Sequence, residues 1–269
     1  MKKYLGTAAN IAIYFIIFYF SMYVFELMMK VKLYSTIIVA NPSINLISIF
    51  CLSMLLYWLV HKWNLIFLNT ERKTLAKVLK LVKVTPKTAG FSFLIGLAGA
   101  LASIGLLQIA SLNKMFPDLE ENVHMMMNSG NFVLIIVALG ILFPALEEVI
   151  FRGLMFNTLK KVMPISVAVI IQMVAYCLVQ PSVAFMLISV VTGTVYCLIY
   201  IIVRSLWAPI IVQTTAMSLF FIGYKLEIGS GISNDPLAFT VTIAGLVIMI
   251  GLTILLMRKK RRSQLTTTY

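Results

Sequence analysis

The chain has 269 residues, of which 61% are hydrophobic and 12% charged, and its mean hydropathy is +1.00. A water-soluble domain of this length cannot bury so much apolar surface, so the composition excludes a soluble globular protein and predicts a membrane protein. The formal net charge of +13 would suggest a nucleic-acid partner in a soluble protein, but here the cations are distributed as expected for a membrane surface.

Eight apolar stretches approach the roughly 20 residues that cross a bilayer, and together they predict an all-α, polytopic membrane helical bundle. The first stretch follows a basic opening like that of a signal peptide. Its apolar run is longer than the usual ~7–15 residues, and no small-residue cleavage site follows, so we interpret it as a retained span. The fifth stretch is short. The predicted spans are 8–28, 44–61, 90–110, 131–156, 164–180, 182–203, 206–224 and 237–257.

The segment between the second and third spans, residues 62–89, places apolar residues at helical spacing opposite lysines. This pattern predicts a basic amphipathic helix on the anionic inner surface of the membrane, with a solvated connector as the alternative. Pro86 would end such a helix before the third span. The apolar set is Leu75, Val78, Leu79 and Val82, and the basic set is Lys73, Lys77 and Lys80.

The third span spaces small residues four apart, as at Gly96 and Ala100, which predicts close packing against neighbouring helices. The polar loop that follows, residues 111–130, contains His124 near two glutamates. Such a group can bind a metal ion, but we expect a solvated loop.

Most cations fall on one side of the eight-span topology, whereas the opposite loops hold few lysines and most of the acidic residues. Because the Lys/Arg bias sets orientation, we expect both termini to be cytoplasmic and the basic surface to face an anionic inner leaflet. We expect no nucleic-acid partner. The cations on the predicted inner side are Lys2, Lys3, those from Lys62 to Lys87, Lys160, Lys161, Arg204 and the tail RKKRR.

The fourth span contains an unusual charged cluster within FPALEEVIFRG, residues 143–153. Ionisable residues inside a membrane are costly and normally face a cavity or one another. Glu148 and Arg152 are four apart, so they share a helical face and can pair, whereas Glu147 is rotated by about 100°. One carboxylate therefore needs a proton, a water, a cation or another donor. Pro144 could kink the helix and open a wet pocket. A buried ion pair that only fixes helix packing is the alternative.

Three blocks of sequence resemble one family. EEVIFRG followed by LMFNTL resembles the first motif, EExxxR, of the CAAX-protease and bacteriocin-processing (CPBP, or Abi) family of intramembrane proteins. AYCLVQ (175–180) is similar to the second motif, and TGTVYCLIYIIVRSLWAPIIVQTTAM (192–217) to the third region. We therefore expect a single integral membrane domain over 1–269: N-terminal spans and connectors in 1–130, a CPBP/Abi-like core in 131–220, and a last span over 237–257 with a basic cytoplasmic tail.

In active members, the resemblance implies a glutamate-dependent protease. A first-motif Glu and a second-motif His activate water, and a third-motif His and Asn stabilise the oxyanion. Glu147, Glu148 and Arg152 match the first motif, and Tyr176 stands at the aromatic position of the second.

The histidines of the family pattern are replaced in this chain. Gln180 and Gln213 stand at the two His positions, and Met217 stands at the Asn position. Glutamine neither takes up a proton near neutral pH nor presents an imidazole to a metal, although Gln213 could donate to an oxyanion. Two carboxylates without imidazoles make a poor zinc site, so we expect no metal and no cofactor.

These departures predict a catalytically degenerate scaffold or regulator. It would bind a membrane protein or peptide in a cavity that includes Tyr176 and Met217. The resemblance suggests the bacterial plasma membrane and cell-surface, cell-wall or bacteriocin-immunity processes. One alternative is an active intramembrane endopeptidase with Glu147 as general base, helped by Gln180 and Gln213. A proton-coupled carrier is a further alternative, although no second half shows matching broken helices.

Overall fold

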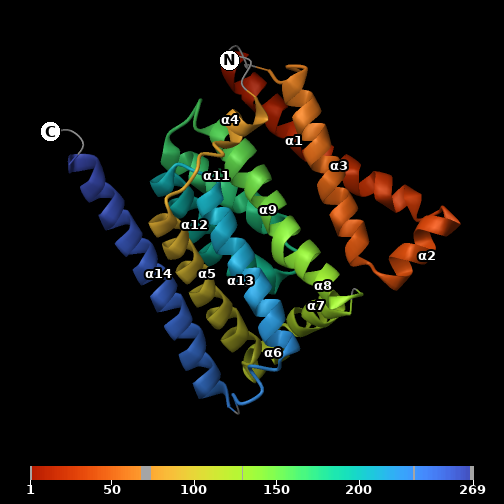
Figure 1. Cartoon of the computed structure of the whole chain (residues 1–269), viewed down its shortest axis with the longest axis vertical. Helices are drawn as coiled ribbons and strands as arrows, with labels where there is room; N and C mark the ends of the chain where they lie inside the picture. The colour runs from red at the N-terminus through yellow and green to blue at the C-terminus, as the bar shows by residue number, and fades with distance from the viewer. Residues whose placement is uncertain (1, 68–73, 129, 233, 267–269) are drawn as a thin grey trace.

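The computed structural model describes residues 2–67, 74–128, 130–232 and 234–266. Every regular element in these residues is a helix, which confirms the all-α fold (Figure 1). The elements are α1 (Lys2–Met28), α2 (Lys32–Ala40), α3 (Ser43–Lys62), α4 (Leu75–Leu79), α5 (Pro86–Leu107), α6 (Ala110–Met115), α7 (Pro117–Met127), α8 (Phe132–Ile135), η1 (Ile136–Leu142), α9 (Phe143–Glu148), η2 (Val149–Phe156), α10 (Asn157–Leu159), α11 (Ile165–Leu178), α12 (Val183–Val203), α13 (Trp207–Lys225) and α14 (Asp235–Thr266).

Seven helical stretches of the described chain are long and apolar enough to cross a membrane, and they correspond to seven of the eight predicted spans. They are 2–28, 43–62, 86–107, 132–159, 183–203, 207–225 and 235–260. The remaining prediction, the fifth span over 164–180, corresponds to α11, which has 14 residues and is therefore about 21 Å long. The chain is a multi-pass membrane protein.

The helix α11 is short, yet it joins opposite ends of the bundle. One end, here called the basic end, carries Lys80, Lys160, Arg204 and Arg258. It is held together in part by the backbone N–H of Leu206, which donates to the Lys80 carbonyl at 3.1 Å. At the opposite end α12 begins beside α7, so α11 leads from the basic end to the start of α12. Both chain ends consequently lie toward the same end of the bundle (Figure 1).

The helix α5 lies between α13 and α14, which are its most extensive neighbours. A Cβ at Gly96 would lie 2.5 Å from the Val212 carbonyl oxygen of α13. On the other side, a Cβ at Gly245 of α14 would meet the backbone of Ala102 at 2.6 Å. The small residues of the third span therefore permit close helix packing, as the sequence predicted.

Two connectors differ from their predictions. The amphipathic helix of 62–89 is reduced to the five residues of α4, and Lys73 lies outside the described residues. Leu75 and Leu79 are buried in the core and do not face the membrane surface. Pro86 begins α5 instead of ending a helix. The expected loop 111–130 folds as α6 and α7, and Leu119 and Val123 are buried.

Candidate functional site

The site is built on one continuous helical stretch, Phe132–Leu159, in which wider π-helical turns flank α9. Such turns are rare and often mark functional sites. Pro144 has no N–H to donate to the carbonyl of Gly140 four residues earlier. The hydroxyl of Ser218 on α13 donates to that carbonyl at 3.1 Å instead. Because a Cβ at Gly140 would lie 2.7 Å from the same hydroxyl, glycine allows α13 to approach.

The predicted ion pair between Glu148 and Arg152 is present and fully buried. Arg152 Nη1 lies 2.9 Å from Glu148 Oε1, and both side chains have no exposed surface. Arg152 Nη2 donates to the carbonyl of Gly193 on α12 at 3.1 Å. The guanidinium also lies over the rings of Tyr176 at 4.4 Å and Tyr196 at 5.7 Å. Arg152 thus ties α11 and α12 to the site helix.

Glu147 points to a different set of partners. Gln213 Nε2 on α13 donates to Glu147 Oε2 at 2.5 Å, and the Tyr176 hydroxyl lies 3.3 Å from the same oxygen. Gln213 Nε2 is also 3.3 Å from the Tyr176 hydroxyl, so the three groups form one cluster. Gln180 interacts with Glu147 as well, while its Nε2 donates to the Tyr176 carbonyl at 3.2 Å. Glu147 is half-buried, in contrast to the sealed Glu148.

Met217 and the two histidines make no described hydrogen bond to the Glu147 cluster. Met217 is half-buried and packs in the hydrophobic cluster of Phe220 and Leu139, and no described hydrogen bond joins it to Glu147. The ring of His61 stacks against Tyr14, with ring centroids 6.0 Å apart. His124 of α7 contacts Asn128, the residue that follows this helix. Neither histidine supplies an imidazole to the Glu147 cluster.

Sequence reasoning missed three residues that shape the site: Gly193, Tyr196 and Ser218. A Cβ at Gly193 would lie 2.8 Å from Cδ1 of Tyr176 and 3.3 Å from Nη2 of Arg152. Gly193 and Tyr196 lie within the block 192–217, whose glycine and aromatic residues were a signal. Ser218 follows that block, and nothing in its own sequence surroundings predicts a hydrogen bond to Gly140.

A second polar network anchors the basic end of the site helix. Asn157 Nδ2 donates to the carbonyls of Gly153 at 2.7 Å and Val78 at 3.0 Å. Lys160 Nζ donates to Asn157 Oδ1 and lies over the ring of Tyr200 at 5.6 Å. Burial, together with the neighbouring Lys80, lowers the pKa of Lys160 to about 7. The α4 segment is thereby joined to the end of the site helix.

The described residues contain no group of three or more His, Cys, Asp or Glu side chains that could hold a metal ion. The expectation of no cofactor stays a prediction.

Comparison with known proteins identifies the region that holds these contacts. Residues 129–219 match a family model described as Rce1-like, type II CAAX prenyl endopeptidase Rce1-like. The chain carries an Rce1-like region of the CPBP family. This Rce1-like region begins and ends within two residues of the predicted 131–220 core, and it contains Glu147, Glu148, Arg152, Tyr176, Gln180, Gln213 and Met217. The searches of curated proteins and of solved structures found no match.

Proposed function

We propose that this chain is a catalytically silent member of the CPBP family that binds a segment of a membrane protein, or a peptide, at the Glu147 cluster. The observation that carries the proposal is the hydrogen bond from Gln213 to Glu147. An amide occupies a position where the family pattern has a histidine, and it keeps the carboxylate in place without an imidazole.

The chemistry of the cluster favours binding over peptide hydrolysis. Hydrolysis needs groups that accept a proton from water and return one to the leaving amine. Glu147 is one such group, but the neighbours that contact it are two amides and a phenol. An amide does not exchange protons near neutral pH. Loss of one positioned acid–base group typically lowers the rate by about 10²–10⁴-fold.

The cluster also has unused hydrogen-bonding capacity. Gln213 Oε1 is buried and accepts no hydrogen bond from the described residues. An unpaired buried acceptor is unfavourable, so a donor that reached it would be stabilised. A backbone N–H of an inserted peptide is such a donor, and the half-buried Glu147 carboxylate lies beside it. The cell-surface, cell-wall and bacteriocin-immunity settings rest on the family resemblance alone.

Site-specific photo-crosslinking tests this proposal. A photoreactive amino acid would replace Met217, which is one helical turn from Gln213. We expect a discrete membrane-protein or peptide adduct in living cells, weakened at least about fivefold by Glu147→Ala through loss of the cluster. Glu227→Ala is the matched control, because this acidic residue lies after α13 and away from the cluster. If Glu147→Ala left the yield of the adduct unchanged, the result would contradict the proposed site.

A further inference from the structure

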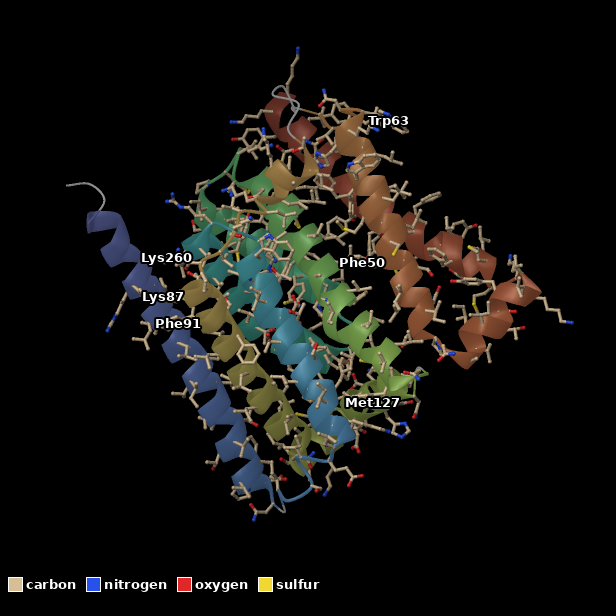
Figure 2. All side chains as sticks on the ribbon, in the orientation of Figure 1. Phe50, Trp63, Lys87, Phe91, Met127 and Lys260 are labelled. Carbon is tan, nitrogen blue, oxygen red and sulfur yellow. The ribbon has the colours of Figure 1, made fainter. Side chains whose placement is uncertain are left out.

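A groove at the basic end lies between the end of α12 and the last turns of α14. Its cavity volume is about 470 Å³. The lining combines four apolar side chains with three cations. These are Ile201, Ile202, Ile254 and Met257, and Arg204, Arg258 and Lys260. Figure 2 labels Lys260 near the C-terminal end of α14.

Arg204 and Arg258 have no acidic neighbour among the described residues of the groove wall. No acidic side chain that the structure describes lines the groove. Glu147 and Glu148 belong to the site helix, and Asp235 lies at the other end of α14, where it accepts from the backbone N–H groups of Ala110 and Ser111. The described residues therefore supply no counter-charge to Arg204 and Arg258 within the groove.

Arg204 has an unusual backbone for an arginine. It ends α12 with a φ of +58° and a ψ of 26°, in the left-handed region. Helices usually place glycine or asparagine in this conformation, because a Cβ makes it costly. Residues that keep such a costly backbone conformation often lie at functional sites. The side chain of Arg204 is exposed and lines the groove.

Adjacent residues of α14 have separate roles. Lys259 Nζ lies 4.9 Å from the centroid of the Phe91 ring on α5, and Lys259 does not line the groove. Arg258 and Lys260, on either side of it in sequence, do line the groove. Lys259 therefore packs against α5, whereas Arg258 and Lys260 line the groove.

We propose that this groove binds one anionic phospholipid of the adjacent leaflet. The phosphate would lie between Arg204 and Arg258, and an acyl chain would cover the isoleucines and Met257. Basic pockets between membrane helices recognise anionic headgroups in this way. A free phosphate would use only the cations, and it would leave the apolar floor of the groove uncovered.

Native mass spectrometry of the full chain in detergent tests the site, with palmitoyl-oleoyl phosphatidylglycerol as the probe and the phosphatidylcholine of the same chains as reference. We expect one phosphatidylglycerol to bind at least about tenfold more tightly than phosphatidylcholine. Each cation near an anionic lipid contributes roughly fivefold, so Arg204→Gln with Arg258→Gln should weaken binding by about thirtyfold. The control pair Lys87→Gln with Lys259→Gln removes equal charge from the same end and should change binding less than about twofold.

Arg204→Gly separates charge from folding, because glycine adopts this backbone more readily than arginine. It should unfold at the same or a higher temperature than the wild type and still bind phosphatidylglycerol about fivefold more weakly. Equal binding of the two lipids, or equal losses in both double variants, would overturn the proposal. Full displacement of the lipid by an equal concentration of glycerol phosphate would do the same, since the apolar floor would then contribute nothing.

Discussion

At the residue scale, the two adjacent glutamates have separate roles. Glu148 forms a fully buried ion pair with Arg152. The Arg152 guanidinium in turn contacts Tyr176 of α11 and Gly193 of α12, and so holds these helices to the site helix. Glu147 is half-buried and engages Gln213 and Tyr176. The pair therefore combines a fully buried carboxylate in an ion pair with one that keeps exposed surface.

The buried ion pair gives the first prediction. Arg152→Met would leave Glu148 buried without its cation and should destabilise the protein by about 3–5 kcal/mol. Arg152→Met combined with Glu148→Gln removes both charges and should recover most of that loss. Thermal unfolding in detergent compares the two variants. If the double variant were as unstable as the single one, the loss would come from the ring and Gly193 contacts rather than from an uncompensated charge.

Gly193 gives the second prediction. Gly193→Ala would press a methyl group against the Tyr176 ring, which is already packed beside Arg152 and Phe151. We expect a loss of about 1–3 kcal/mol, measured by thermal unfolding. Gly251→Ala in α14 is the control, because a Cβ there meets nothing within 4 Å and should be neutral or stabilising by up to ~1 kcal/mol. Equal effects of the two changes would show that Gly193 is not required for close packing.

At the scale of elements, the sequence predicted helices well and connectors poorly. The helical spacing of Leu75 and Leu79 is real, and both side chains are buried. The helix nevertheless ends at Leu79, because tertiary hydrogen bonds engage the next residues. Lys80 has a left-handed φ of +54° and accepts from Leu206, and the Val82 carbonyl accepts from the Ser205 hydroxyl at 2.5 Å. Partners more than 120 residues away are invisible in a local pattern.

The site helix shows the same limit. Pro144 predicted a disturbed helix, and the two glutamates predicted a polar site. The sequence did not show that π-helical turns would flank α9, or that Ser218 would donate to the Gly140 carbonyl. The motif spacing indicated which residues would share a site, and the contacts depend on how α11 and α13 pack.

Ser218 gives the third prediction. Ser218→Ala would leave the Gly140 carbonyl without this donor and should destabilise the protein by about 1–2 kcal/mol in thermal unfolding. Thr240→Ala is the matched control: the Thr240 hydroxyl donates only to a carbonyl of its own helix and is exposed. An unchanged unfolding temperature for Ser218→Ala would show that the carbonyl finds another donor beside Pro144.

At the scale of the whole molecule, the even number of passes places both chain ends at the basic end (Figure 1). The eight-span topology predicted this parity, although α11 is shorter than an ordinary span. This helix still joins opposite ends of the bundle, because α10, which precedes it, contacts α4 at the basic end, and α12, which follows it, begins near α7. Hydropathy indicates where the long spans lie, and the structure shows which helices are neighbours.

Orientation gives the fourth prediction. In a Cys51→Ser background, whose other cysteines are buried, single cysteines would replace Lys77 at the basic end and Lys114 in α6. The Lys/Arg bias predicts that a membrane-impermeant maleimide labels position 114 in intact cells and labels position 77 only after lysis. Labelling of position 77 in intact cells would reverse the orientation.

The most direct test of the catalytically silent site is a comparison of protein termini in membrane and secreted fractions at matched expression. Wild type is compared with Glu147→Gln, and a variant carrying Gln180→His, Gln213→His and Met217→Asn is the gain-of-activity comparison. We predict identical termini for wild type and Glu147→Gln. The variant with the restored histidines should produce new termini, and these should disappear when Glu147→Gln is added to it. Termini present in wild type and lost in Glu147→Gln would show that the chain supports proteolysis without either histidine, and they would contradict a silent site.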